Sequence, residues 1–314
     1  MTKPILLAAG NYNDWDSAPM AEAWDVHWLD STDAILELPA EIAGKARALA
    51  FKFHAPIGPG HMDALPRLGL IANYGVGYDA IDVGAASARG IKVTNTPDVL
   101  NDDVADLAVG MLLAQTRQMV QASDFVRQGH WSTGAFPLNR TLAGRRAGIM
   151  GLGRIGREIA DRLAAFKMTI HYHSRSPKDV PDGWTYHADP VDLARNCDDM
   201  VVALVGGAAT QDYVSAEVIE ALGPDGTIVN ISRGSTIDEG ALLDALEQGR
   251  LRGAALDVFR SEPDLDPRFL KLDTVLLQPH QGSATAETRR AMGQLQRDNI
   301  AAFFRGEGLL TPVN

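Results

Sequence analysis

The chain has 314 residues, enough for two domains, and its 46% hydrophobic and 22% charged residues are the balance of a globular protein. A net charge of −11 without a basic cluster argues against nucleic acid or an anionic membrane as a partner, whereas local arginines could still bind a small anionic substrate. No apolar run approaches the ~18 residues that span a bilayer, and the single cysteine, Cys197, fits a reducing, cytoplasmic location.

Ten apolar runs along the chain are predicted to be β-strands. Four lie in the first hundred residues: PILLAAG (4–10), ALAFKF (48–53), LGLIANYG (68–75) and IKVTNTP (91–97). Six follow residue 145: RAGIMGLG (146–153), MTIHYHSR (168–175), DMVVALV (199–205), GTIVNIS (226–232), GAALDVF (253–259) and TVLLQPH (274–280). Apolar runs separated by helical stretches indicate parallel sheets, so the predicted class is α/β with two Rossmann-like or flavodoxin-like, doubly wound domains.

Two amphipathic helices are predicted to connect the domains. Residues 101–122 open with Asn and acidic residues, which suit a helix N-terminus, and continue with apolar residues at helical spacing. Residues 285–305 form the second helix, after the last predicted strand. We therefore predict a discontinuous substrate-binding domain of residues 1–98 plus 285–314, a dinucleotide-binding domain of residues 99–284, and a ligand cleft between them.

The sequence GLGRIG (151–156) has the form GxGxxG and lies between a predicted strand and a predicted helix. In this setting Gly151 permits a tight turn, Gly153 lets the backbone approach a pyrophosphate, and Gly156 lets the helix and strand pack closely. The N-terminus of the helix supplies free N–H groups and partial positive charge for phosphates. A glycine turn without a ligand is the alternative, and the flanking strand and helix favour the cofactor.

Residues 171–176 read HYHSRS, about twenty residues after the glycine motif, where NAD-binding domains usually carry an acidic residue for the ribose 2′-hydroxyl. Here Arg175 stands between Ser174 and Ser176. A guanidinium can bind the 2′-phosphate of NADP through charge-assisted hydrogen bonds, and serine hydroxyls can add donors. The sequence therefore predicts NADP(H) as the cofactor, with a surface arginine of no function as the alternative.

Three polar segments follow late predicted strands: NISRGSTID (230–238), LDVFRSEP (256–263) and LLQPHQGSAT (276–285). In an open parallel sheet, ligands gather at the carboxyl ends of the strands. We therefore expect Arg233, Glu262 and His280 to meet there as a carboxylate binder, an acid partner and a proton donor. No spacing of cysteine and histidine indicates a metal site.

Further motifs occur in the same chain: NYGVGYDAID (73–82), NTPDVLNDDVADLAVGMLLA (95–114) and LAGRRAGIMGLGRIGREIA (142–160). Together with the three polar segments they resemble the D-2-hydroxyacid dehydrogenase family, in its glyoxylate/hydroxypyruvate reductase branch. The resemblance implies NADPH-dependent reduction of a 2-keto acid, such as glyoxylate or hydroxypyruvate, to the D-2-hydroxy acid. The alternatives are a larger substrate, such as phenylpyruvate or 2-ketogluconate, a phosphonate-oxidising relative, and a dinucleotide-sensing binding protein.

The resemblance also implies roles for individual residues. Arg233 would hold the substrate carboxylate and carbonyl oxygen, and the backbone N–H groups of Val76 and Gly77 would bind the other side of the carboxylate. His280 would protonate the oxygen as hydride reaches C2, and Glu262 would orient its ring. The implied cofactor contacts are Gly151, Leu152, Gly153, Arg154, Ile155, Gly156, Ser174, Arg175, Ser176, Val205, Ile231, Ser232, Arg233, Asp257 and His280.

Two further features bear on the site and the assembly. Val205 stands where the family often has proline, in a segment that passes the cofactor, and this departure removes no catalytic group. GHWSTGAFPL (129–138) resembles a loop that reaches toward the partner subunit, so a homodimer is expected. Within that loop, Trp131 is expected either to influence which substrate is accepted, by reaching across the dimer, or simply to pack in the dimer interface.

Overall fold

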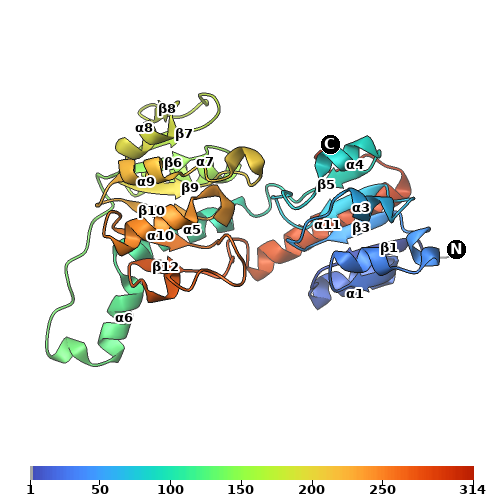
Figure 1. The fold of residues 1–314 in the computed structure, drawn as a ribbon, viewed down its shortest axis with the longest axis horizontal. Coiled ribbons are helices and arrows are strands. Elements are labelled where there is room, and N and C mark those ends of the chain that lie inside the picture. The colour runs from blue at the N-terminus through green and yellow to red at the C-terminus, as the bar shows by residue number, and fades with distance from the viewer. Residues whose placement is uncertain (1–2) are drawn as a thin grey trace. The chain divides into compact units, whose positions relative to one another are not determined.

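The computed structural model describes residues 3–314, which form two compact units. Unit 1 comprises the described residues up to Leu100 and those from Ala284 onward, and unit 2 comprises Asn101–Ser283. In Figure 1 unit 1 runs from blue to cyan and ends in red, and unit 2 runs from green to orange. The chain thus passes between units after residues 100 and 283, where the sequence predicted 98 and 284.

Unit 1 is built on a five-stranded parallel sheet with the order β2-β1-β3-β4-β5. Its strands are β1 (Ile5–Ala9), β2 (Asp25–Leu29), β3 (Ala48–Phe51), β4 (Leu70–Asn73) and β5 (Lys92–Thr94). Its helices are α1 (Asp14–Ala23), α2 (Ala40–Ala43), α3 (Pro59–Asp63), α4 (Val83–Ala88), α11 (Ala286–Arg305) and the 3-10 helix η1 (Asp33–Glu37). The inner strands are buried on both faces because α1 and α11 cover one face and α2, α3 and α4 cover the other.

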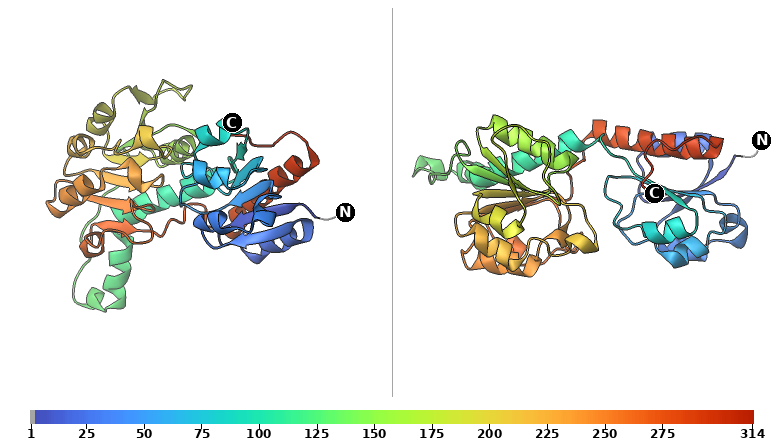
Figure 2. Two further views of the ribbon diagram at one scale, coloured as in Figure 1. Left: turned by 45° about the vertical axis from the view of Figure 1, so that its right-hand side comes forward. Right: turned by 90° about the horizontal axis from the view of Figure 1, so that it is seen from above.

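Helix α11 belongs to unit 1 although it follows the whole of unit 2 in the sequence. It lies along the sheet in the right-hand view of Figure 2. Gln296 Nε2 donates to the backbone oxygen of Ala72 in β4 at 2.7 Å, and Arg297 pairs with the buried Asp16 of α1. The last helix therefore completes the core of unit 1.

Unit 2 contains a seven-stranded parallel sheet with the order β12-β11-β10-β9-β6-β7-β8. Its strands are β6 (Arg146–Met150), β7 (Thr169–His173), β8 (Thr185–His187), β9 (Asp199–Val202), β10 (Thr227–Asn230), β11 (Gly253–Leu256) and β12 (Val275–Leu277). Its helices are α5 (Asn101–Thr116), α6 (Met119–Arg127), α7 (Arg154–Ala165), α8 (Pro190–Arg195), α9 (Ala216–Leu222) and α10 (Glu239–Glu247), with 3-10 helices η2 (His130–Ser132), η3 (Ala208–Thr210), η4 (Gly234–Thr236) and η5 (Phe269–Lys271). Helices α5 and α7 cover one face of the sheet, and α8, α9 and α10 cover the other (Figure 2). The predicted pair of parallel-sheet α/β domains is confirmed.

All ten predicted runs contain strands, but two strands and one helix break were not predicted. The additional strands, β2 and β8, both lie at a sheet edge, where one side is open and the apolar signal is weak. The helix expected over residues 101–122 is broken at Gln118, whose φ of 47° lies in the left-handed region. This break separates the buried helix α5 from α6, none of whose residues is buried.

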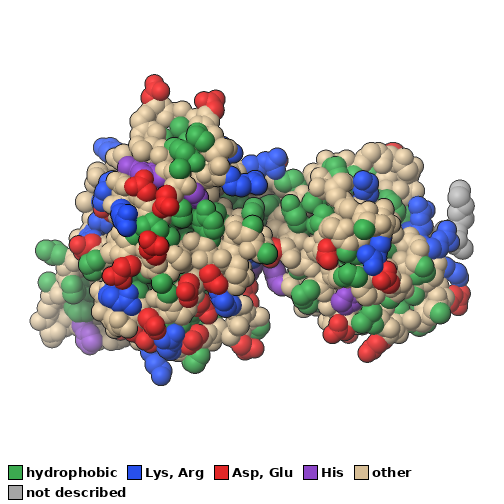
Figure 3. Space-filling model, turned by 45° about the horizontal axis from the view of Figure 1, so that its top comes forward, with side chains coloured by type: hydrophobic (Ala, Val, Ile, Leu, Met, Phe, Trp, Pro, Cys, Tyr) green, Lys and Arg blue, Asp and Glu red, His purple; other side chains and the backbone are tan. Residues whose placement is uncertain are grey.

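The surface of the described residues carries charges of both signs. On the face drawn in Figure 3, acidic and basic side chains are interspersed over unit 2 rather than gathered in a patch of one sign. Among residues 3–314, no helix is both long and apolar enough to cross a bilayer. On this face of unit 2, therefore, neither sign of charge forms an extended patch.

Candidate active site

Three neighbouring strands of unit 2 end side by side. Strands β10, β11 and β12 are parallel, and their last residues, Asn230, Leu256 and Leu277, are in register. The chain segments that follow stay together, because Asp257 N donates to Asn230 O at 3.0 Å and Gln278 N donates to Leu256 O at 2.8 Å. The three polar segments singled out in the sequence therefore begin side by side, at the carboxyl ends of three neighbouring strands of one sheet.

His280 and Glu262 form a hydrogen-bonded pair beyond these strand ends. Nδ1 of His280 lies 2.6 Å from Oε2 of Glu262, and Oε1 of Glu262 accepts the backbone N–H of Phe259 at 2.9 Å. Because a carboxylate only accepts hydrogen bonds, Nδ1 of His280 carries the proton of this hydrogen bond. Both side chains are about one-third exposed, at 31% and 28%, so a small molecule can reach the ring.

The backbone at His280 is unusual and is held by Asp257. The φ of His280 is 52°, in the left-handed region that few non-glycine residues adopt, and its N–H donates to Asp257 O at 2.8 Å. The Asp257 carboxylate accepts the backbone N–H groups of Gln281 and Gly282, each at 2.8 Å. Burial raises the pKa of the Asp257 carboxyl, and these backbone hydrogen bonds oppose the rise. Asp257 therefore fixes the turn that carries His280.

Arg233 lies on a loop whose backbone is held by hydrogen bonds from residues on either side of it. Its backbone oxygen accepts from Asn230 Nδ2 at 3.0 Å and from Thr236 Oγ1 at 2.6 Å. The next residue, Gly234, has no room for a side chain, because a methyl group there would overlap the backbone of Phe259. This close approach packs the Arg233 loop against the segment that leads to Glu262.

The glycine motif forms the predicted strand–turn–helix. Gly151 ends the turn after β6 with a φ of 103°, and a methyl group at Gly156 would overlap the oxygen of Gly151. A methyl group at Gly153 would meet no protein atom within 4 Å, and α7 begins there without a side-chain cap. The open side of the turn thus offers helix N–H groups to an anion, which fits a cofactor pyrophosphate.

Arg175 follows β7 and is exposed. Within residues 3–314 its guanidinium has no hydrogen-bond or ion-pair partner, whereas the Ser174 hydroxyl donates to the backbone oxygen of Ser176 at 2.6 Å. Strand β7 is next to β6, and Gly151 N donates to His173 O at 2.9 Å, so this segment lies beside the glycine turn. The segment therefore provides an exposed cation beside the glycine turn, while the Ser174 hydroxyl donates its proton within the segment.

The expected substrate anchor lies in unit 1, on the turn after β4. The backbone oxygens of Gly75 and Gly77 accept from Asn73 Nδ2 at 3.0 and 2.9 Å, and that of Val76 accepts from Asn95 Nδ2 at 3.0 Å. In the described part of the chain, the N–H groups of Val76 and Gly77 have no protein acceptor. A turn with inward carbonyls and available N–H groups suits a carboxylate.

The remaining predicted cofactor residues lie around the same strand ends. Leu152, Ile231 and Ser232 are buried, and the Ser232 hydroxyl donates to Asn230 Oδ1 at 2.9 Å. Val205 follows β9 and is 76% exposed. The others are Arg154 and Ile155, which form the first turn of α7. These positions are compatible with cofactor contacts, which stay a prediction.

Two tyrosines that were not predicted from the sequence form hydrogen bonds with the backbone of the Arg175 segment. Tyr172 of β7 and Tyr186 of β8 are direct cross-strand partners, with ring centroids 5.5 Å apart. Their hydroxyls reach the backbone of Lys178 and Ser174. The alternation in HYHS marks Tyr172 as a core residue, but nothing in the sequence pairs it with Tyr186, because β8 is a three-residue edge strand.

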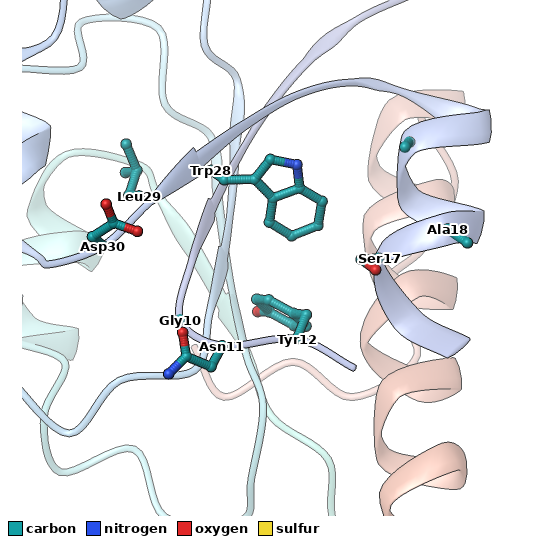
Figure 4. Close-up of a pocket in the computed structure, with 9 residues that line it drawn as sticks. Gly10, Asn11, Tyr12, Ser17, Ala18, Trp28, Leu29 and Asp30 are labelled. Atoms are coloured by element: carbon teal, nitrogen blue, oxygen red, sulfur yellow. The ribbon is translucent and has the colours of Figure 1, made fainter. Parts of the chain in front are cut away.

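A cavity of about 500 Å³ lies in unit 1, between the end of β1, α1 and β2. Figure 4 shows the Tyr12 and Trp28 rings facing this space, with Ser17 of α1 on the other side. None of the residues predicted for the site lines it. Elsewhere, Cys197 is buried and burial raises its pKa, as expected for a structural cysteine, and no cluster of potential metal ligands occurs within residues 3–314.

Comparisons with known proteins give the same picture over most of the chain. Residues 109–282 match the family described as D-isomer specific 2-hydroxyacid dehydrogenase, NAD binding domain. The chain is 46% identical over 252 residues to hydroxyphenylpyruvate reductase of Plectranthus scutellarioides, covering 80% of each protein. It is 47% identical over 250 residues to glyoxylate/hydroxypyruvate reductase A of Arabidopsis thaliana, covering 79% of each.

Among solved structures, the chain resembles the NADPH-dependent glyoxylate/hydroxypyruvate reductase of Sinorhizobium meliloti in complex with NADP and malonate. The TM-score is 0.94 and the sequence identity is 43%. The match covers 99% of this chain and 97% of that one, so both units contribute to the similarity.

Proposed function

The chain belongs to the D-isomer specific 2-hydroxyacid dehydrogenase family and is an oxidoreductase, and we propose that it reduces a small 2-keto acid to the D-2-hydroxy acid with NADPH. The observation that carries this proposal is the His280–Glu262 pair, at 2.6 Å, in which Glu262 lies on the loop that packs against the loop of Arg233. Glyoxylate and hydroxypyruvate are the leading substrates, because relatives over most of the chain are named for them.

The proposed mechanism gives each group one task. Arg233 binds the substrate carboxylate, since a guanidinium offers paired donors to a planar anion. His280, protonated on both ring nitrogens, donates the Nε2 proton to the keto oxygen as negative charge develops there. Glu262 keeps Nδ1 of His280 in place and balances the charge of the protonated ring. Bound NADPH supplies the hydride that adds to C2.

Arg175 supports NADPH over NADH as the cofactor. Its guanidinium is exposed and has no protein partner among the described residues, and it follows the strand beside the glycine turn. A 2′-phosphate would gain charge-assisted hydrogen bonds there, whereas the 2′-hydroxyl of NADH offers no charge. The solved relative in complex with NADP supports the same preference.

The test is a spectrophotometric assay on the purified chain. Glyoxylate, hydroxypyruvate, phenylpyruvate and 2-ketogluconate are each offered with NADPH and with NADH. We expect oxidation of NADPH with one or more of the small keto acids. Tight NADPH binding without oxidation by any of the four would contradict the reductase and favour a dinucleotide-sensing protein.

The cofactor preference is tested separately with Arg175→Ala. We expect the KM for NADPH to rise about tenfold or more, because a charge-assisted hydrogen bond to the phosphate is lost. The KM for NADH should stay unchanged, because NADH carries no 2′-phosphate. An unchanged KM for NADPH would show that Arg175 is an ordinary surface residue.

A larger 2-keto acid is the second candidate substrate. The hydroxyphenylpyruvate reductase that is 46% identical over 80% of the chain favours it. The groups proposed to act touch only the carboxylate, C2 and its oxygen, which all 2-keto acids share. The ranking of kcat/KM across the four substrates decides between the two candidates.

We further infer that the protein acts as a cytoplasmic homodimer. Helix α6 has no buried residue, and large apolar side chains are exposed on it and the loop after it: Met119, Val120, Val126, Trp131 and Leu138. Exposure of several large apolar side chains in one segment favours cover by a second copy. Light scattering at micromolar concentration should give twice the chain mass of 33.7 kDa, and a monomer would refute the dimer. The lone, buried Cys197 supports the location.

A further inference from the structure

Residues 174–178 (SRSPK), named here the phosphate loop, contain Arg175 and have neither helical nor strand structure. The loop is nevertheless anchored at both ends by tyrosine hydroxyls. Tyr186 OH donates to the backbone oxygen of Ser174 at 3.2 Å. Tyr172 OH accepts the backbone N–H of Lys178 at 3.1 Å and lies 3.4 Å from the Lys178 oxygen.

The two tyrosines form one support rather than two separate contacts. They are paired across β7 and β8, and their rings pack at 5.5 Å with 50° between the ring planes. Tyr172 is only 2% exposed, so its hydroxyl needs an internal partner, and Lys178 is that partner. Phenylalanine at both positions would fill the same space, so packing alone does not explain the hydroxyls.

The rest of the β7–β8 connection is also anchored by side chains. Arg157 of α7 donates to the backbone oxygen of Asp179 at 3.1 Å, and its guanidinium lies 4.9 Å from the centre of the Trp184 ring. Inside the loop, Ser174 Oγ donates to Ser176 O at 2.6 Å. The backbone is thus held on each side of Arg175, whose own guanidinium has no partner within residues 3–314.

We propose that the hydroxyl groups of Tyr172 and Tyr186 are positioning groups for the cofactor 2′-phosphate, because they hold the phosphate loop in the shape that presents Arg175. A loop that is already ordered loses less conformational freedom when it binds an anion, so affinity for the phosphate rises. This role rests on the NADPH preference proposed above. It makes cofactor discrimination depend on two residues that do not themselves touch the cofactor.

The test uses the full chain and two probes that differ only in the 2′-phosphate, namely 2′,5′-ADP and 5′-AMP. Their Kd values are measured by calorimetry for the wild type, Tyr172→Phe, Tyr186→Phe and the double variant. We expect each single variant to raise the Kd of 2′,5′-ADP about three- to tenfold, as for loss of one hydrogen bond, and to leave that of 5′-AMP unchanged. A loss of folded protein would instead raise the Kd of both probes, so a wild-type Kd for 5′-AMP shows that the variant is folded.

Tyr74→Phe is the matched control. It also removes a hydroxyl that donates to a backbone oxygen, that of Arg289 at 2.7 Å, but it lies in unit 1. This variant should leave the ratio of the two Kd values at the wild-type level. In an Arg175→Ala background the tyrosine substitutions should have no further effect, because both act through the same contact.

The outcomes separate this proposal from the one on which it rests. If the wild type binds both probes equally, the NADPH preference is wrong and the positioning role fails with it. If the wild type favours 2′,5′-ADP and the tyrosine variants do so to the same degree, only the positioning role is wrong. A further loss in the Arg175→Ala background would likewise overturn it.

Discussion

His280 illustrates how much of the site is decided at single residues. Its ring is held by Glu262 at 2.6 Å, and its left-handed backbone is held by the N–H donated to Asp257 O at 2.8 Å. The side-chain contact sets which ring nitrogen carries the fixed proton, and the backbone contact sets where the ring lies. The two contacts come from different residues of the loop after β11, so they can be tested separately.

Glu262→Gln tests the side-chain contact. Glutamine has the same shape but no charge to balance a protonated His280, so we expect kcat/KM to fall about 10²- to 10⁴-fold. The matched control is Glu239→Gln, because Glu239 Oε2 accepts the N–H of Arg260 in the same loop at 2.9 Å. Steady-state kinetics should show near wild-type activity for the control; equal losses in both variants would contradict the assigned role.

Asp257→Asn tests the effect of the buried carboxyl on stability. Its pKa is raised in the folded state by burial, so the folded protein binds this proton more tightly than the unfolded chain does. The stability that this tighter proton binding contributes is fully present below the pKa of an ordinary aspartate, about 4, and is lost as the pH rises through the pKa of Asp257 in the folded protein. The variant cannot titrate there, so its unfolding free energy should rise relative to the wild type as pH increases from about 4.

Urea unfolding of both proteins at a series of pH values measures this difference. Asparagine also places an N–H group against the backbone N–H of Gln281 or Gly282, which lowers stability by about 1–3 kcal/mol at every pH. The prediction therefore concerns the slope with pH and not the level. Parallel curves for the two proteins would contradict it.

At the scale of elements, the end of β10 brings two loops into contact. Gly234 follows Arg233 and lies against the backbone of Phe259, on the way to Glu262. The sequence SRGSTID marks this stretch as polar, but it does not reveal that glycine is needed because another loop packs there. This kind of requirement arises between segments that are distant along the chain.

Gly234→Ala should separate these loops. The added methyl group overlaps the Phe259 backbone, so we expect a loss of about 1–3 kcal/mol of stability and a fall in kcat/KM. Gly240→Ala is the control, because its methyl group would have only Asp238 Oδ1 nearby, at 3.6 Å, and lies within α10. Thermal unfolding should show the control as neutral or stabilised by about 0.4–1 kcal/mol. An unchanged Tm for Gly234→Ala would show that the loop can move to accommodate the methyl group.

Two edge strands and one helix break were not predicted from the sequence. Strands β2 and β8 lie at sheet edges, where side chains are partly exposed and need not be apolar. The break at Gln118 separates two helices within one continuous helical pattern. The local pattern is too weak to mark the edge strands and too continuous to mark the break.

At the scale of the whole molecule, the two units differ in how they are assembled. Unit 2 is one continuous segment with its own buried core, whereas unit 1 needs α11 from the far end of the chain. Without α11, the face of β3 and β4 would lose the cover of Ile300 and the hydrogen bond from Gln296. The units should therefore differ when they are expressed alone.

A fragment of residues 101–283 should fold and bind 2′,5′-ADP, with a Kd within about tenfold of the full chain, because its sheet and core are internal. A fragment of residues 1–100 should not fold. Near-ultraviolet circular dichroism and calorimetry measure both properties. A fragment 101–283 without a cooperative unfolding transition would show that unit 2 depends on unit 1.

The sequence by itself determined the family, the α/β class, all ten of its predicted strand regions and the strand–turn–helix around GLGRIG, and these are confirmed. Such features are local: burial on both faces makes a strand apolar, and a tight turn beside a phosphate site needs glycine at fixed spacing. The sequence also pointed to Arg233, Glu262 and His280, because strand ends collect ligands, and their catalytic roles stay a prediction.

Only the tertiary structure decided which side chains meet. The order β12-β11-β10 places three loops from different parts of the chain together. The pairing of β7 with the edge strand β8 lets the Tyr186 hydroxyl reach the backbone oxygen of Ser174. No local pattern contains this information, because contacts between distant segments depend on strand order and register. The sequence thus specified which chemical groups the protein has, and packing specified which of them can act together.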